Sequence, residues 1–152
     1  MSRVEILTKY SDEIAAEMGR ILTFVSGSHD GSPLSRKWLD EVIKSPYHEQ
    51  FVAYDNDGKI VGMATMSIVF IPSKGRNTYL EEIVVDESCQ GQGIGSKLWD
   101  AIVEWSKEQG ARRMEFTASG NSEKKQKAVD FYLRKGVSIH DTNFFRYELG
   151  SK

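Results

Sequence analysis

A strand that runs through a glycine-rich turn into a strong helix is the feature that most constrains the fold of this chain. The strand residues Ile83–Val85 are apolar and β-branched, three glycines lie within Gln90–Gly95, and apolar residues then recur at helical spacing up to Trp105. Glycines let a backbone approach a ligand closely, and the free N–H groups of a first helical turn attract anions. The junction therefore predicts a site for the phosphate groups of a cofactor.

Several kinds of turn share this glycine pattern. A P-loop requires Gly-Lys-Ser/Thr, whereas Gly95 is followed by Ser96-Lys97 in the reverse order, which excludes an ATPase of that type. A dinucleotide-binding turn follows the first strand of its unit, whereas this turn follows the fourth expected strand, so that interpretation is weak. Considered alone, the pattern is equally compatible with a glycine turn that binds no ligand.

Helical and strand patterns alternate along the rest of the chain. Strands are expected at residues 3–10, 51–54, 60–70, 78–85, 113–117, 137–140 and 144–149. Helices are expected behind Ser11-Asp12, around Trp38–Ile43, over 93–109 and over 123–135. A mixed sheet with helices on both faces buries every apolar face, so we predict an α/β fold.

Turn signals join the expected strands into hairpins. The pair Asp57-Gly58 is typical of a tight turn between strands 51–54 and 60–70. Breaking residues at Pro72–Asn77 predict a second turn before strand 78–85. We expect this second turn and the loop Ser26–Ser35 to determine which substrate binds.

Length and charge limit the organisation of the protein. A chain of 152 residues fits a single domain, predicted over 1–152. A net charge of -2 gives no general argument for a nucleic-acid partner. The N-terminus lacks the order of a signal peptide and no apolar stretch is long enough to span a bilayer, so no membrane association is expected. The single cysteine, Cys89, favours the cytoplasm.

Two signatures together resemble the GNAT superfamily of N-acetyltransferases. The turn reads Gln-x-x-Gly-x-Gly after Ile-Val-Val-Asp, with Gln90, Gly93 and Gly95 in the places of the acyl-CoA pyrophosphate loop. Downstream, Ala128–Val137 is similar to the pattern A-x-x-F-Y-x-x-x-G-F, with Val137 in place of the final Phe. The resemblance implies a mostly antiparallel central sheet with one parallel, splayed strand pair, 78–85 and 113–117. It also implies acetyl-CoA as co-substrate.

The same resemblance implies which residues contact the cofactor. The strand backbone would pair with pantetheine, an amide near Val84 or Val85 would polarise the thioester carbonyl, and the turn would hold the pyrophosphate. The cofactor-binding residues expected on this basis are Ile83, Val84, Val85, Gln90, Gly91, Gln92, Gly93, Ile94, Gly95 and Ser96. The three histidines and Cys89 lack the spacing of a zinc site, so no metal is expected.

Acetyl transfer to an amine needs proton transfers. An alkylamine with a pKa near ~10.4 is mostly protonated at pH 7, so a general base is needed. Neighbouring strand residues face opposite sides, so Glu81 and Glu82 cannot both face the site unless a bulge intervenes, and we prefer Glu81. By resemblance, Tyr132 is the general acid that protonates the coenzyme A thiolate. The alternatives are solvated glutamates and a core tyrosine.

Other polar residues give weaker signals. Asn121 and the basic run Lys124–Lys127 match the superfamily only loosely, and a solvated charge run is the preferred interpretation. Cys89 has no histidine near it in sequence, which argues against a covalent acyl-enzyme.

With the resemblance, these residues predict direct transfer of acetyl from acetyl-CoA to a primary amine of a small molecule, in a ternary complex. A peptide or protein N-terminus or lysine as acceptor, and a non-catalytic acyl-CoA-binding module, stay open as alternatives. A homodimer also stays open, because exposed C-terminal strands commonly pair in the superfamily that the chain resembles.

Overall fold

The computed structural model describes residues 2–25, 29–118 and 123–150, which fall into two compact units. The first unit, Met1–Phe116, contains the sheet and the helices α1, α2 and α3. The second unit, Thr117–Lys152, contains the helix α4. A single domain over 1–152 stays a prediction.

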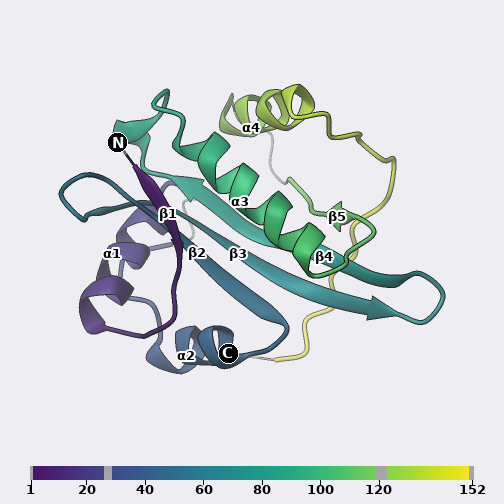
Figure 1. Ribbon diagram of the computed structural model, residues 1–152, viewed down its shortest axis with the longest axis horizontal. Helices are drawn as coiled ribbons and strands as arrows, with labels where there is room; N and C mark the ends of the chain where they lie inside the picture. The colour runs from purple at the N-terminus through teal and green to yellow at the C-terminus, as the bar shows by residue number, and fades with distance from the viewer. Residues whose placement is uncertain (1, 26–28, 119–122, 151–152) are drawn as a thin grey trace. The chain divides into compact units, whose positions relative to one another are not determined.

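The first unit is built on a five-stranded sheet in the order β1-β2-β3-β4-β5 (Figure 1). Neighbouring strands pair antiparallel except β4 and β5, which are parallel. This confirms the expected mixed, mostly antiparallel sheet. The strands are β1 Arg3–Ile6, β2 His48–Tyr54, β3 Ile60–Ile71, β4 Gly75–Val85 and β5 Met114–Glu115.

Helices cover both faces of the sheet, as predicted. On one face α1 (Asp12–Leu22) and α2 (Arg36–Lys44) pack on the apolar cross-strand row Val52, Met63 and Val84. On the other face α3 (Ile94–Glu108) crosses the strands, and its Trp105 ring meets Phe51 edge to face at 6.1 Å (Figure 1). Because strand side chains alternate, each face of the inner strands is buried by a different set of helices.

Serine side chains cap the starts of α1 and α2, the first at the Ser11-Asp12 signal expected from the sequence. Ser11 Oγ accepts a hydrogen bond from the Ile14 N–H at 3.1 Å, which caps α1. Ser35 caps α2 in the same way through the Trp38 N–H at 3.4 Å. Within α1, Gly19 is needed for space rather than conformation, because a Cβ there would collide with the Ser32 carbonyl oxygen.

The second hairpin turn is shorter than predicted. Strand β4 begins at Gly75, and pairing of Arg76 with Phe70 and of Asn77 with Val69 extends the ladder into the predicted breaker. Cross-strand pairing thus overrides the low strand propensity of Gly and Asn. In contrast, the strand expected over 113–117 is reduced to Met114–Glu115.

The second unit confirms the predicted helix but not the strands after it. Helix α4 (Glu123–Arg134) ends in a Schellman motif, in which Gly136 has φ +87° and the Val137 N–H donates to the Tyr132 carbonyl at 3.1 Å. The strands predicted at 137–140 and 144–149 are wrong, since residues 137–150 form none. A strand needs a partner for its backbone groups, and the apolar alternation here is exposed instead, with Phe145 at 86% and Tyr147 at 87%.

Candidate functional site

The glycine turn leaves the start of α3 open. Gly91 and Gly93 have φ of +82° and +81°, and a Cβ on either would meet nothing within 4 Å. Gly93 is the N-cap of α3, and among the described residues no side chain makes a capping hydrogen bond there. The N–H groups of Ile94–Ser96 belong to the first helical turn and so lack intrahelical acceptors. The turn and the positive end of the helix dipole therefore suit an anionic group.

A buried aspartate fixes the strand end just before this turn. Asp86 is 2% exposed and accepts hydrogen bonds from Arg20 Nη1 at 2.7 Å and from the Ser88 N–H and Oγ at 3.0 and 2.8 Å. Burial alone raises the pKa of Asp86, but the hydrogen bonds from Arg20 and Ser88 outweigh burial and leave the pKa below its ordinary value. Since Arg20 also donates to the Ile60 carbonyl at 3.1 Å, α1, β3 and the turn are tied together.

A shallow pocket of about 190 Å³ adjoins the glycine turn. Its lining includes Cys89, Gln92 and Lys97. The Lys97 ammonium donates to the Ser2 carbonyl at 2.8 Å and to Ser2 Oγ at 3.1 Å, so it anchors the N-terminal segment. Gln92 is exposed, as is Gln90 at the start of the turn.

One edge of β4 is largely unpaired within the first unit. Strand β5 pairs with β4 only at Thr78 and Tyr79. The Asp86 N–H donates to the Val61 carbonyl of β3 at 2.9 Å, so by alternation the Val84 N–H also points to β3 while Ile83 and Val85 present theirs to the other edge. Of the two amides considered from the sequence, Val85 rather than Val84 thus has the orientation to meet an external carbonyl.

A β-bulge determines where the two glutamates point. Thr65 pairs with Glu82 while the next residue of β3, Met66, pairs with Leu80, which leaves Glu81 as an extra residue in β4. Adjacent strand residues normally face opposite sides, yet Glu81 and Glu82 are both exposed. The bulge that the sequence analysis named as a condition for this arrangement is therefore present.

Both glutamates belong to the α1/α2 face of the sheet. Thr65 and Ser67 follow Met63 in alternate positions of β3 and so share its face. Glu82 lies opposite Thr65, and Glu81 Oε1 accepts a hydrogen bond from Ser67 Oγ at 2.8 Å. Two carboxylates thus lie on one face of one strand, a few residues before the amides of Ile83 and Val85.

Polar side chains continue across this part of the sheet. Beside the apolar row, Gln50, Thr65 and Glu82 lie opposite one another on β2, β3 and β4. The Thr65 hydroxyl donates to Gln50 Oε1 at 2.7 Å, and Gln50 Nε2 donates to the Ala64 carbonyl at 3.1 Å. In the next row His48 lies opposite Ser67, and its Nδ1 is 2.7 Å from Ser45 Oγ. The face therefore changes from apolar to polar near the glutamates.

Tyr132 lies in the second unit, on α4, whereas Glu81 and the glycine turn lie in the first. Burial raises the pKa of the Tyr132 phenol above its ordinary value. Its ring meets that of Phe131 edge to face, with centroids 5.6 Å apart. The phenol therefore keeps its proton at neutral pH, as a proton donor must.

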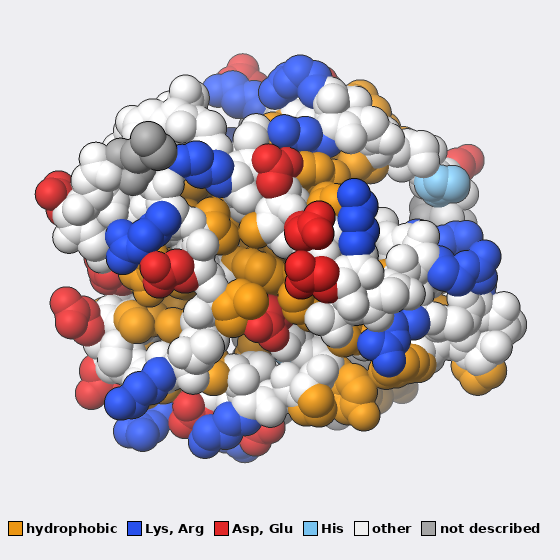
Figure 2. Space-filling view, in the orientation of Figure 1, with side chains coloured by type: hydrophobic (Ala, Val, Ile, Leu, Met, Phe, Trp, Pro, Cys, Tyr) orange, Lys and Arg blue, Asp and Glu red, His pale blue; other side chains and the backbone are white. Residues whose placement is uncertain are grey.

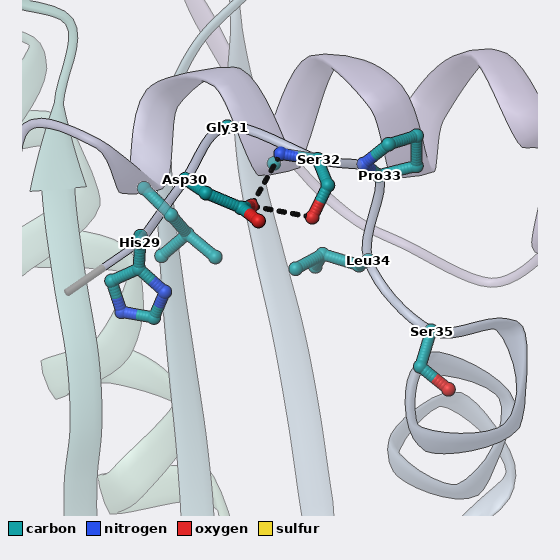
Figure 3. A pocket seen from close by; sticks show the side chains of 9 residues that line it. His29, Asp30, Gly31, Ser32, Pro33, Leu34 and Ser35 are labelled. Carbon is teal, nitrogen blue, oxygen red and sulfur yellow. Dashed lines mark hydrogen bonds between the residues drawn. The ribbon is translucent and has the colours of Figure 1, made fainter.

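A second pocket, of about 230 Å³, is lined by the loop that we expect to determine which acceptor binds (Figure 3). Of this loop, Ser26–Ser28 lie outside the described residues, and the remainder runs from His29 to Ser35 against Gly19 and Leu22 of α1. Asp30 accepts hydrogen bonds from Ser32 Oγ at 2.6 Å and from its N–H at 2.9 Å, which lower the pKa of Asp30 (Figure 3).

Several weaker sequence signals can now be placed. Asn121 lies outside the described residues, while Lys124 and Lys127 are exposed on α4. Within the described ranges no group of three or more His, Cys, Asp or Glu is arranged to hold a metal, and no helix there has the length and apolar character needed to cross a membrane. On the face shown in Figure 2, basic and acidic side chains are interspersed.

Sequence reasoning missed three residues around this site. Ser67 had no signal, because its contact with Glu81 depends on the register of two strands. Arg20 and Asp86 are 66 residues apart, so their ion pair could not be found by local pattern. Asp86 alone had a hint, since it stands directly before the glycine turn.

The chain belongs to the Acetyltransferase (GNAT) family, whose sequence profile it matches over residues 15–137. An aminoglycoside N(6')-acetyltransferase type 1 of Serratia marcescens is 30% identical over 89 residues, which cover 55% of this chain and 61% of the relative. A thialysine N-epsilon-acetyltransferase of Sus scrofa is 32% identical over 78 residues, which cover 51% of this chain and 44% of the relative. The matches thus span less than two thirds of either relative.

Solved structures agree on the fold. A crystal structure of the aminoglycoside acetyltransferase meta-AAC0020, from an uncultured soil metagenomic sample, in complex with sisomicin has a TM-score of 0.81 at 22% identity and covers 98% of this chain and 97% of its own. The aminoglycoside 6'-N-acetyltransferase AAC(6')-Ih from Acinetobacter baumannii has a TM-score of 0.74 at 14% identity, with 99% and 100% covered. At these identities the similarity concerns the fold.

Proposed function

We propose that this protein transfers the acetyl group of acetyl-CoA directly to a primary amine of a small molecule. The observation that carries the proposal is the bulge in β4, which presents Glu81 and Glu82 on one face just before the unpaired strand edge and the glycine turn. The names of the two curated relatives support an amine of a small molecule as acceptor.

The chain's own groups fit an acyl-CoA. The uncapped start of α3 suits the pyrophosphate, with Gln90–Ser96 as the binding segment. The unpaired edge of β4 suits the amide groups of pantetheine, which would pair there as an added strand. Acetyl-CoA, when bound, supplies an acetyl group activated as a thioester.

Glu81 and Val85 would act on the first step of the transfer. Glu81, directly or through a water, takes a proton from the substrate ammonium, so that the nitrogen lone pair can attack the thioester carbonyl and form the new C–N bond. The Val85 N–H donates a hydrogen bond to the carbonyl oxygen as negative charge develops on it. Glu82, on the same face, holds the ammonium near Glu81.

Tyr132 would act on the second step. As the C–S bond breaks, the phenol donates its proton to the departing sulfur, whose conjugate thiol has a pKa near the ~8.5 of a free cysteine. After Glu81 has taken the first proton of the ammonium, the nitrogen loses a second proton as the amide forms, and this proton restores the phenol of Tyr132 while the proton on Glu81 passes to solvent. The substrate ammonium and acetyl-CoA thus give the amide, coenzyme A as the thiol and one proton.

Initial-rate kinetics test the proposal. Thiol release from acetyl-CoA is measured against amino sugars, polyamines, lysine analogues, aminophosphonates and peptides, with both substrate concentrations varied. Direct transfer predicts intersecting double-reciprocal lines with at least one small amine. Parallel lines would indicate an acyl-enzyme. Turnover of peptides alone would shift the acceptor to a protein, and coenzyme A binding without any turnover would reduce the protein to a binding module.

A further inference from the structure

We infer that Ser67 is a positioning residue for Glu81, holding the carboxylate in the orientation needed to accept the substrate proton. The inference rests on the proposed role of Glu81 as general base. It starts from one contact, in which Ser67 Oγ lies 2.8 Å from Glu81 Oε1. A serine hydroxyl at that distance from a carboxylate donates a hydrogen bond to it.

The geometry of the hairpin makes this contact necessary for Glu81 in particular. As the extra residue of the bulge, Glu81 has no residue directly opposite it on β3 to restrict its side chain. The side chain is also exposed, so packing does not fix its rotamer. The hydrogen bond from Ser67 therefore supplies an orientation that regular pairing would otherwise give.

Ser67 is itself held firmly, as a positioning residue must be. It lies in β3, which runs between β2 and β4 (Figure 1). Ser67 is paired with His48 of β2 on one side and with Tyr79 of β4 on the other. The residue is 7% exposed. The hydroxyl takes one carboxylate oxygen of Glu81 and leaves Oε2 for a substrate proton.

The chain offers a matched control for the loss of a buried hydroxyl. Ser106 is 6% exposed, and its Oγ lies 2.7 Å from Thr78 Oγ1, where α3 packs on the opposite face of β4. Ser106→Ala removes a buried hydroxyl contact of the same strand without touching either glutamate. It therefore measures what a merely structural hydrogen bond contributes.

The test measures kcat and both KM values for a small amine that the protein turns over. We expect Ser67→Ala to lower kcat about tenfold with the KM for acetyl-CoA unchanged, since loss of alignment of a catalytic group costs this much or more. Ser106→Ala should keep kcat within about twofold of the wild type at a similar loss of melting temperature. Ser67→Thr, which keeps the hydroxyl, should retain most of kcat, and Ser67→Val, of similar volume without it, should behave as Ser67→Ala.

The Glu81→Gln background separates the possible outcomes. If Ser67 acts through Glu81, Ser67→Ala causes no further loss of kcat in that background. An equal loss in both backgrounds, a normal kcat in Ser67→Ala, or equal kcat in Ser67→Thr and Ser67→Val would each overturn the inference while leaving the function intact. A wild-type kcat in Glu81→Gln would instead overturn Glu81 as the base, and the inference with it.

Discussion

Glu81 and Glu82 differ in their backbone setting although they are adjacent and both exposed. Glu82 has a cross-strand partner in Thr65, whereas Glu81 is the extra residue of the bulge and is held by Ser67. One carboxylate is thus oriented by a side chain and the other by regular pairing. This difference is the reason to assign them different roles, proton transfer to Glu81 and ammonium binding to Glu82.

Isosteric substitutions should separate these two roles. Glu81→Gln is expected to lower kcat by about a hundredfold or more, the usual contribution of a general base. Glu82→Gln is expected to raise the KM for the amine by up to about fivefold with kcat nearly unchanged, because an exposed ion pair contributes ~1 kcal/mol or less. The same initial-rate assay measures both variants. The reverse pattern would exchange the two roles. Wild-type kinetics in both variants would rule out both roles.

At the level of elements, the glycine turn and α3 together form the proposed phosphate site. Gly93 caps the helix with a backbone conformation that other residues adopt at a cost, and a Cβ added to it would meet nothing within 4 Å. Gly110, just past the other end of α3, has a similar φ of +73° and equally open surroundings. Both glycines therefore have a left-handed backbone conformation, and they lie at opposite ends of the helix dipole.

Alanine at each position should separate strain from binding. Gly93→Ala and Gly110→Ala are both expected to lower the free energy of unfolding by ~1–2 kcal/mol, the cost of a left-handed residue. Only Gly93→Ala should also weaken coenzyme A binding, by about tenfold in calorimetric titration, a change of ~1.4 kcal/mol. Equal affinities in the two variants would mean that the phosphates bind elsewhere.

Asp86, which precedes the glycine turn, predicts a pH dependence of the free energy of unfolding. The pKa of Asp86 is lowered in the folded protein, so its stabilising contribution is present above the unfolded pKa of ~3.9 and is lost as the pH falls through the folded value. Asp86→Asn should cost ~1–3 kcal/mol at pH 7, because it weakens the contact of a partly exposed Arg20 and the bonds from Ser88. Between pH 5 and pH 2 (roughly, from the pKa values of carboxyl groups) its stability should change less than that of the wild type.

Urea unfolding midpoints over that pH range measure the effect. Asp57→Asn, at an exposed position of the first hairpin turn, serves as the control and should keep the wild-type pH profile. Parallel profiles for Asp86→Asn and the wild type would mean that the carboxylate does not stabilise this turn.

An element can be predicted from the sequence when the residues that stabilise it are close together along the chain. Helix α1 was predictable because Ser11 caps it within a few residues, and α2 because its apolar residues recur at helical spacing. The strands after α4 were predicted wrongly because a strand forms only with a partner, which alternation of apolar residues cannot supply. The orientation of Glu81 and Glu82 could be stated only as a condition, since a bulge arises from the register of two strands.

At the scale of the whole molecule, the proposed chemistry needs residues from both units. Glu81 and the glycine turn belong to the first unit and Tyr132 to the second. The family profile itself runs across the division, from residue 15 to 137. A shared role in one reaction is therefore the reason to expect that the units behave as one domain.

Calorimetry tests this expectation. We expect one unfolding transition whose calorimetric and van't Hoff enthalpies agree, as for a two-state domain. Acetyl-CoA at a hundredfold excess over its Kd should stabilise that whole transition by ~2.7 kcal/mol. A second transition that acetyl-CoA does not shift would show that Thr117–Lys152 unfolds independently of the cofactor site.

The extra residue in β4 also bears on which changes in chain length the protein tolerates. Removing Glu81 itself would leave Thr65 opposite Glu82 and Met66 opposite Leu80, so β3 and β4 would pair without interruption and the remaining side chains would keep their faces. Removing a residue elsewhere in β4 would instead shift the register by one and move every side chain on one side of the deletion to the other face of the sheet. A shortened strand at the bulge is therefore compatible with the same hairpin but lacks the proposed base, whereas a deletion elsewhere in the strand would exchange its inside and outside.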